Sequence, residues 1–260
     1  MSNLSFVKYE GAGNDFILID DRALGFSFNP LLIRRLCDRK FGIGADGLIL
    51  LQPEFRMRIF NRDGTEAAMC GNGVRCLARF LADLGIPGPY RIAVHDRIVE
   101  ASLEGERVCV AMGEPRDVKL HLQTEQGPVH FVDTGVPHAV LFLDNVEEAP
   151  LETLGPFLRH HPLFAPRGAN ANLAALQPDG SVRVRTFERG VEGETLACGT
   201  GACAVAAIVW ELHGRPAIRI SYKGGDLEIR RKGKSLFMTG PANRVFSGSV
   251  ILADTVNYSS

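Results

Sequence analysis

Short apolar runs alternate with turns rich in glycine, aspartate and asparagine along the whole chain. Runs such as FILIDD (16–21), GLILL (47–51) and AIRISY (217–222) have the length and the content of branched and aromatic residues that favour strands. Two longer patterns, centred on 104–106 and 232–234, predict hairpins because a glycine-containing turn separates two strand-like segments. We therefore expect many of the strands to be antiparallel.

One long helix is predicted in each half of the chain. The two segments are GNGVRCLARFLADLG (71–85) and GTGACAVAAIVWELHG (199–214), and both end in a glycine, the residue that most often terminates a helix. The second segment is apolar on almost every side. A helix of that kind must be enclosed, and we expect a surrounding sheet to enclose it.

Several blocks of the first half recur in the same order in the second. GAGNDFILID (11–20), FGIGADGLILL (41–51) and RIFNRDGTEAAMCGNG (58–73) correspond to TGVPHAVLFLD (134–144), PRGANANLAAL (166–176) and VRTFERGVEGETLACGTG (184–201). Each half then continues into its long helix. This order indicates an internal duplication.

The duplication predicts an α/β (α+β) fold of two pseudo-symmetric domains, each a curved and mostly antiparallel sheet wrapped around a central helix. We place the junction within GEPRDVK (113–119). Residues 1–116 then form the first domain and 117–245 the second.

The segment GIGADG (42–47) matches the glycine pattern of dinucleotide binding, but its context does not fit. In that motif a strand precedes the glycines and a helix follows. Here the helix-like PLLIRRLCDRKF precedes them and the strand-like LILL follows. We therefore do not expect a nicotinamide cofactor.

Composition and charge narrow the classes of function. The 260 residues are 45% hydrophobic, with 29 basic and 30 acidic residues and a net charge of −1, so no positive field exists to hold nucleic acid or an anionic membrane. We find no long apolar run and no secretory signal, and expect a cytoplasmic protein. Its six cysteines are then reduced thiols. Their spacing does not match common zinc sites, so we predict no metal.

A cysteine stands at the start of both long helices, in MCGNGVRC (69–76) and ACGTGAC (197–203). The free N–H groups and the dipole of a helix start, equivalent to roughly half a positive charge, stabilise a thiolate. The glycines beside Cys70 and Cys198 let a ligand approach the backbone. We interpret these two thiols as catalytic and the other four, Cys37, Cys76, Cys109 and Cys203, as core residues.

Two domains placed face to face would bring both thiols and both helix starts to one amino acid. One thiolate could then remove the α-proton while the opposite thiol supplies a proton to the other face. The charge that develops on the carboxylate would meet the helix starts. The predicted chemistry is stereoinversion of an amino-acid substrate without a cofactor.

These residues resemble the diaminopimelate epimerase family, whose members interconvert LL- and meso-diaminopimelate on the route to lysine and peptidoglycan. The resemblance covers nearly the whole chain and is most specific in GAGNDF, FNRDGTEAAMCGNGVRC, FERGVEGETLACGTGAC and YKGGDLEI. It implies two pseudo-symmetric domains, a final strand (about 246–260) that returns to the first domain, and a homodimer.

The resemblance also implies the roles of site residues. Cys70 and Cys198 correspond to the acid–base pair, and His138 lies where the family often has a histidine near the cleft. The residues implied to bind the substrate carboxylate are Gly71, Asn72, Gly199 and Thr200. Those implied to bind the rest of the substrate are Asn14, Asn61, Asn170, Glu188 and Arg189. Two positions depart from the family pattern: Gly47 replaces a glutamine and Val136 replaces an asparagine.

Other functions remain open at this stage. The two departures suggest a racemase of broader specificity that also accepts glutamate. A proline-racemase-like enzyme shares the two-thiol plan, although the asparagines and Arg189 favour a substrate that is polar at both ends. An amino-acid binding module would use the helix starts without chemistry, and a redox sensor would join Cys70 to Cys198.

Overall fold

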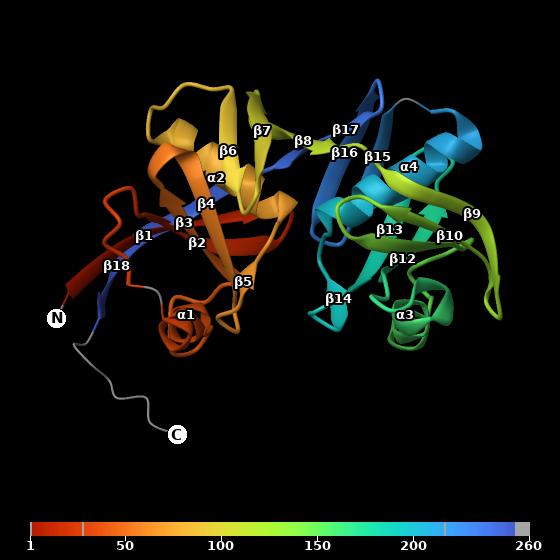
Figure 1. Ribbon diagram of the computed structural model, residues 1–260, viewed down its shortest axis with the longest axis horizontal. Coiled ribbons are helices and arrows are strands. Elements are labelled where there is room, and N and C mark those ends of the chain that lie inside the picture. The colour runs from red at the N-terminus through yellow and green to blue at the C-terminus, as the bar shows by residue number, and fades with distance from the viewer. Residues whose placement is uncertain (1, 28, 216, 253–260) are drawn as a thin grey trace. The chain divides into compact units, whose positions relative to one another are not determined.

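The computed structural model describes residues 2–27, 29–215 and 217–252 of this mixed α/β protein (Figure 1). These residues form eighteen strands, four α-helices and two short 3-10 turns. They divide into two compact units. The first runs to Val108 and takes in the segment from Ala242 onward, and the second is Cys109–Pro241. The division falls within strand β8 (Arg107–Gly113), a few residues before the junction expected from the sequence.

The first unit is a mixed sheet around one long helix. Strand β1 lies between β18 and β2 in antiparallel pairing, β2–β3 and β4–β6 are parallel, and β3–β4, β4–β5 and β6–β7 are antiparallel. The bounds of these elements are β1 Ser2–Gly11, β2 Asn14–Asp20, α1 Pro30–Cys37, β3 Gly47–Gln52, η1 Pro53–Phe55, β4 Arg56–Asn61, β5 Glu66–Ala67, α2 Gly71–Asp83, β6 Tyr90–Val94, β7 Arg97–Glu104 and β18 Asn243–Leu252.

The second unit follows the same order of pairings. Strand β10 lies between β9 and β11 in antiparallel pairing, β11–β12 and β13–β15 are parallel, and β12–β13, β13–β14, β15–β16 and β16–β17 are antiparallel. The bounds are β9 Arg116–Thr124, β10 Gly127–Asp133, β11 Pro137–Phe142, α3 Leu151–His160, η2 Pro162–Phe164, β12 Asn170–Leu176, β13 Val182–Glu188, β14 Gly193–Thr195, α4 Gly199–His213, β15 Ala217–Tyr222, β16 Gly225–Lys232 and β17 Ser235–Pro241.

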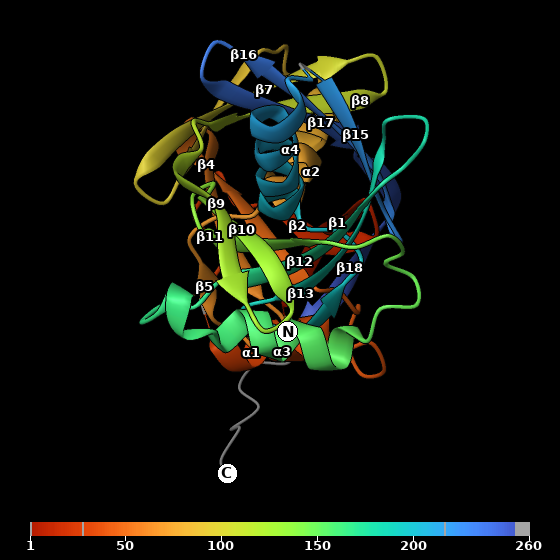
Figure 2. The same cartoon turned by 90° about the vertical axis from the view of Figure 1, so that its right-hand side faces the viewer.

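Helices α2 and α4 are the two long helices expected from the sequence, and both are enclosed by strands of their own unit. Helix α2 contacts β1, β2, β3, β4, β7 and β18, whereas α4 contacts β10, β11, β12, β15, β16 and β17 (Figure 2). Every residue of α4 from Gly201 to Trp210 is buried. Gly214 ends this helix in the left-handed conformation, with φ of 65°. Strands therefore surround the helix that is apolar on almost every side, as the sequence led us to expect.

The glycine-rich loop before β3 has the order expected from the sequence, with helix α1 before it and a strand after it. Gly42 packs directly on α1, because a Cβ at this position would lie 1.9 Å from the carbonyl oxygen of Arg35. This glycine therefore serves helix packing, and the loop does not open a helix as a dinucleotide-binding turn does.

The turn of the predicted hairpin at 232–234 is present between β16 and β17, where Lys232 pairs with Ser235 and Gly233 has a φ of 62°. Among the described residues, no helix combines the length and the apolar character that crossing a membrane requires.

Candidate active site

Cys70 is the residue immediately before helix α2, as the sequence predicts. Its backbone is extended, with φ of −149° and ψ of 113°, so the chain turns into the helix at Gly71. The half-buried thiol donates to Oδ1 of Asn14 across 3.7 Å, and Nδ2 of Asn72 donates to the same oxygen across 3.2 Å. The structure thus brings together four of the predicted residues, Asn14, Cys70, Gly71 and Asn72, at one helix start.

The Asn14 amide is held in this orientation by a network of charges that sequence reasoning missed. Nδ2 of Asn14 donates to Oδ2 of Asp46 across 3.0 Å, and Arg39 bridges Asp46 at 2.9 Å and Asp15 at 2.7 Å. Lys8, which is almost fully buried, pairs with Asp15 at 2.8 Å. Burial alone would raise the pKa of Asp15, but Arg39 and Lys8 outweigh it and lower that pKa to about 2. The network leaves Oδ1 of Asn14 facing the thiol.

Asn61 ends strand β4, is exposed, and donates from Nδ2 to Thr65 Oγ1 across 3.0 Å. It pairs across the strands with Gly47, the position where the family often has glutamine. A Cβ on Gly47 would lie 2.6 Å from the backbone oxygen of Phe60. A side chain at this position therefore requires the backbone of β4 to move. The present spacing of β3 and β4 leaves room only for glycine.

Cys198 immediately precedes helix α4, as Cys70 precedes α2. Cys198 is only 4% exposed. Unlike the Cys70 side chain, its sulfur accepts a backbone N–H at the helix start, that of Gly201 across 3.4 Å, and Oγ1 of Thr200 lies 3.5 Å from the sulfur. Two side chains outside the predicted set hold this turn: Tyr222 donates to the Cys198 carbonyl across 3.1 Å, and Thr134 to the Thr200 carbonyl across 2.9 Å.

Glu188 and Arg189 lie together where strand β13 ends. Thr195 Oγ1 donates to Glu188 Oε2 across 2.9 Å, and burial raises the pKa of the Glu188 carboxyl. The backbone N–H of Arg189 donates to Oδ1 of Asn170 across 2.8 Å, and Nδ2 of Asn170 donates to the Pro137 carbonyl across 3.4 Å. The Asn170 amide therefore bonds to the backbone at both of its ends.

His138 is fully buried on β11, beside Asn170 in the parallel pairing with β12. Burial and the nearby charge of Arg189 lower the pKa of His138 to about 3, so the ring is neutral near neutral pH. Its Nδ1 lies 3.1 Å from Nδ2 of Asn172, a residue that sequence reasoning passed over. The only sequence signal for Asn172 was its place in ANAN, two positions after a predicted binding residue.

The other four cysteines are buried, as predicted. Desolvation raises the pKa of Cys37 to about 12 and raises that of Cys76 as well. These two thiols therefore stay protonated near neutral pH. Cys109 and Cys203 are 7% and 0% exposed.

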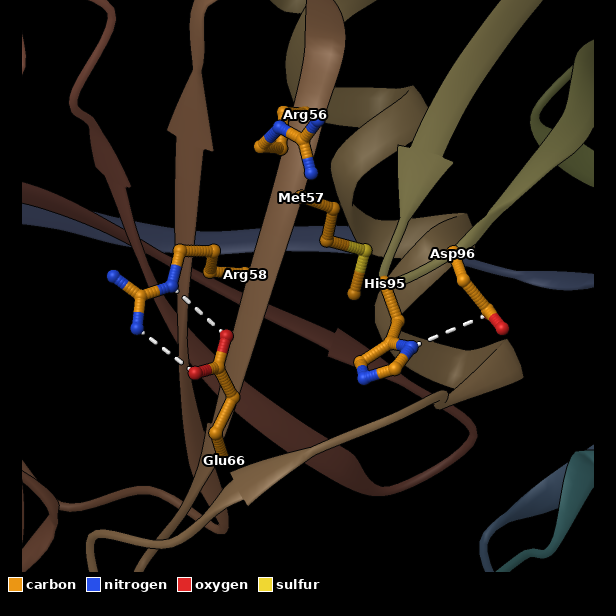
Figure 3. Close-up of a pocket in the computed structure, with 6 residues that line it drawn as sticks. All are labelled: Arg56, Met57, Arg58, Glu66, His95 and Asp96. Atoms are coloured by element: carbon orange, nitrogen blue, oxygen red, sulfur yellow. Dashed lines mark hydrogen bonds and ion pairs between the residues drawn. The ribbon is translucent and has the colours of Figure 1, made fainter.

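A separate pocket of about 230 Å³ opens on the first unit (Figure 3). Arg58 pairs with Glu66 at 2.8 Å on one side, and His95 lies 3.3 Å from Asp96 on the other. The pocket is lined by Arg56, Met57, Arg58, Glu66, His95 and Asp96, none of which belongs to the predicted site.

Solved structures of other proteins have the same fold as this chain. The PhzF-family phenazine biosynthesis protein of Bacillus anthracis aligns with a TM-score of 0.75 and 15% identity, covering 97% of this chain and 100% of that one. A hydroxyproline epimerase from Agrobacterium vitis aligns with a TM-score of 0.70 and 16% identity, covering 97% and 93%. At this level of identity the likeness concerns the fold, which phenazine biosynthesis proteins and amino-acid epimerases share.

The sequence comparisons give the particular family. The diaminopimelate epimerase family model matches residues 6–118 and 130–245. The diaminopimelate epimerase of a Synechococcus species (strain JA-3-3Ab) is 44% identical over 95% of this chain and 98% of its own length, and that of a Hydrogenobaculum species is 40% identical over 93% and 96%. The chain belongs to the diaminopimelate epimerase family.

Proposed function

We propose that this isomerase interconverts LL- and meso-diaminopimelate, a step toward lysine and peptidoglycan, by proton transfers between the α-carbon and the thiols of Cys70 and Cys198. The observation that carries the proposal is the placement of each cysteine immediately before an enclosed helix, with glycine as the first helical residue in both units. Membership of the family supplies the substrate. The placement of the two thiols supplies the chemistry.

In this mechanism one cysteine reacts as the thiolate and takes the α-proton, so that an S–H bond forms as the C–H bond breaks. The electron pair of that bond moves into the substrate carboxylate as an enolate, and the thiol on the opposite face then gives its proton to the α-carbon. The N–H groups at the starts of α2 and α4 stabilise the negative charge as it develops. Two bases are needed because a single base serves only one face.

The mechanism requires the two helix starts to face one substrate. We propose that an internal duplication produced two pseudo-symmetric domains, with the final strand returning to the first. The identical order of strand pairings in the two units supports the duplication, since β1–β7 of the first corresponds to β10–β16 of the second.

The remaining predicted residues receive roles in substrate binding. Gly71, Asn72, Gly199 and Thr200 form the carboxylate cradle, because they are the first residues of the two helices. Arg189 binds a second carboxylate through two parallel hydrogen bonds, and Glu188 binds the substrate amine. The remaining contacts with substrate are assigned to Asn14, Asn61 and Asn170, and His138 pairs with Asn170 between β11 and β12.

No cofactor enters the proposed reaction, and a reducing, cytoplasmic setting suits an enzyme that depends on two thiols. We also propose a homodimer. Strand β18 exposes Val245, Phe246 and Ile251 by 54%, 46% and 69%, and a second copy of the chain would cover exposed apolar side chains of this kind.

Turnover in deuterated water tests the proposal. The wild type should invert diaminopimelate and incorporate solvent deuterium at the α-carbon, whereas Cys70→Ala and Cys198→Ala should lose inversion by at least 10³-fold, an order typical for removing a catalytic group. Each variant should still exchange the α-hydrogen of one stereoisomer, because one base remains. Cys37→Ala is the matched control and should keep wild-type turnover. Full inversion by either catalytic variant would refute the two-base mechanism.

A broader specificity is the second candidate, and the absence of the family's polar side chains at Gly47 and Val136 favours it. The same experiment with glutamate separates the two. Inversion of glutamate alongside diaminopimelate would establish the broader enzyme, and no exchange of its α-hydrogen would exclude it. A binding module would exchange neither substrate.

A further inference from the structure

His138 and Asn172 form a buried pair in the second unit that the family resemblance does not explain. Both residues are 0% exposed. Nδ2 of Asn172 lies 3.1 Å from Nδ1 of His138, and the other ring nitrogen, Nε2, is buried with no hydrogen-bond partner among the described residues. A buried donor or acceptor without a partner is unusual in a folded protein. The pair therefore requires an explanation.

The orientation of the Asn172 amide is fixed by its surroundings. Its Oδ1 accepts the hydroxyl of Thr186 across 2.9 Å. Its Nδ2 lies 3.0 Å from the carbonyl oxygen of Ala139 and 3.4 Å from that of Asn170. The reversed amide would place Oδ1 against these two carbonyl oxygens, which cannot donate a hydrogen bond. The nitrogen of Asn172 must therefore face the imidazole ring.

This orientation determines which nitrogen of His138 carries the proton. A protonated Nδ1 would point its hydrogen at the hydrogens of the Asn172 amide, so Nδ1 must keep its lone pair and accept. Because a neutral imidazole has one N–H, the proton lies on Nε2. The unpartnered nitrogen of the buried ring is thus a donor.

We propose that Asn172 is a positioning residue that holds His138 as the neutral Nε2–H tautomer, so that His138 serves the reaction as a hydrogen-bond donor and not as a base. Nε2 already carries a proton, and Nδ1 could accept one only by displacing Asn172 from Ala139 and Thr186. The donor suits an anionic acceptor, and the carboxylates of diaminopimelate provide one. Only this last step rests on the proposed function.

The tautomer can be measured without substrate. Nitrogen-15 NMR of histidine-labelled wild type should show a lone-pair-bearing Nδ1 and a protonated Nε2 at His138, unchanged across the neutral pH range. Its signals are assigned by their loss in His138→Gln. A protonated Nδ1 at this residue would overturn the proposal, whatever the enzyme's activity.

Two replacements of His138 separate a donor from a base. The amide of glutamine reaches the place of Nε2, and the shorter amide of asparagine reaches only that of Nδ1. His138→Gln should therefore keep kcat within about tenfold of wild type, and His138→Asn should lose about 10²- to 10³-fold, the usual effect of one missing donor. Equal losses in the two variants, at unchanged folding, would contradict the donor role.

The positioning role is tested at Asn172 itself. In Asn172→Asp the carboxylate accepts a proton from Nδ1, so the tautomer reverses and Nε2 becomes an acceptor. We expect the nitrogen-15 pattern to invert, kcat to fall about 10²-fold by the loss of the donor, and the pH profile to gain a histidine titration. A variant that folds, keeps the wild-type pattern and turns over normally would show that Asn172 does not set the state of His138.

Discussion

The glycine at the third position of each long helix offers a matched pair of substitutions, Gly201→Ala in α4 and Gly73→Ala in α2. A Cβ on Gly201 would lie 2.6 Å from Oδ1 of Asn172 and 3.3 Å from the sulfur of Cys198. A Cβ on Gly73 would lie 3.0 Å from the terminal carbons of Ile59 and Met57. The first substitution meets polar atoms of the site, and the second meets only flexible apolar ends.

The two variants should differ in stability. Alanine gains up to about 1 kcal/mol over glycine in a helix, whereas overpacking a core costs about 1–3 kcal/mol. The side-chain ends around Gly73 can shift, so Gly73→Ala should remain within about 0.5 kcal/mol of wild type. Asn172 cannot retreat from residue 201, because Thr186 and Ala139 hold both ends of its amide. Gly201→Ala should therefore lose about 1–2 kcal/mol and a few degrees of melting temperature.

Turnover should separate the variants more strongly than stability. A methyl group on residue 201 displaces either Asn172 or the Cys198 thiol, and a misplacement of about 1 Å commonly lowers a rate about 10²-fold. We therefore expect Gly201→Ala to lose about 10²-fold in kcat while Gly73→Ala keeps wild-type kcat. Urea unfolding and diaminopimelate turnover measure the two effects. Wild-type kcat in a folded Gly201→Ala protein would refute the tight packing between α4 and Asn172.

Two further predictions concern pH. The pKa of Asp15 is lowered to about 2, so its ionised form stabilises the fold by about 2 kcal/mol above pH 4, and this contribution is lost as the pH falls toward 2. Asp15→Asn should be less stable than wild type at pH 7 in urea unfolding, and the two curves should converge in acid; a constant difference would exclude the titration of Asp15 as the cause. The pKa of Glu188 is raised by burial, so its protonated form is the one that favours folding. This contribution to the stability of the fold is fully present below about pH 4 and is lost as the pH rises. Glu188→Gln should be more stable than wild type at pH 7 and equal to it in acid, and its turnover should be lower. A variant that is less stable than wild type at pH 7 would refute the claim that the ionised Glu188 carboxylate destabilises the fold.

The sequence predicted the parts of the fold that depend on local pattern. The run of apolar residues in 199–214 specifies an enclosed helix by itself, and the glycine after each cysteine marks the helix start. The parallel pairing of β2 with β3 and of β11 with β12 was not located, because the connections between these strands pass through α1 and α3, and residue spacing does not report which strands become neighbours.

Of the site residues, only those that lie within recognised sequence motifs were predicted. Cys70, Asn14 and Asn72 were recognised, and the structure places them in contact. Asp46 and Asn172 were missed because each acts on a recognised residue from another strand or loop. Their importance lies in the direction in which an amide points, and that direction depends on neighbours that become close only after folding.

The close approach of Gly47 to the Phe60 carbonyl has a consequence for engineering. A designer who wished to restore the family's glutamine would find that replacing one residue is insufficient, since the obstacle is main chain and no choice of rotamer avoids it. The sheet between these strands would have to be widened first, by changes at positions that never meet the substrate.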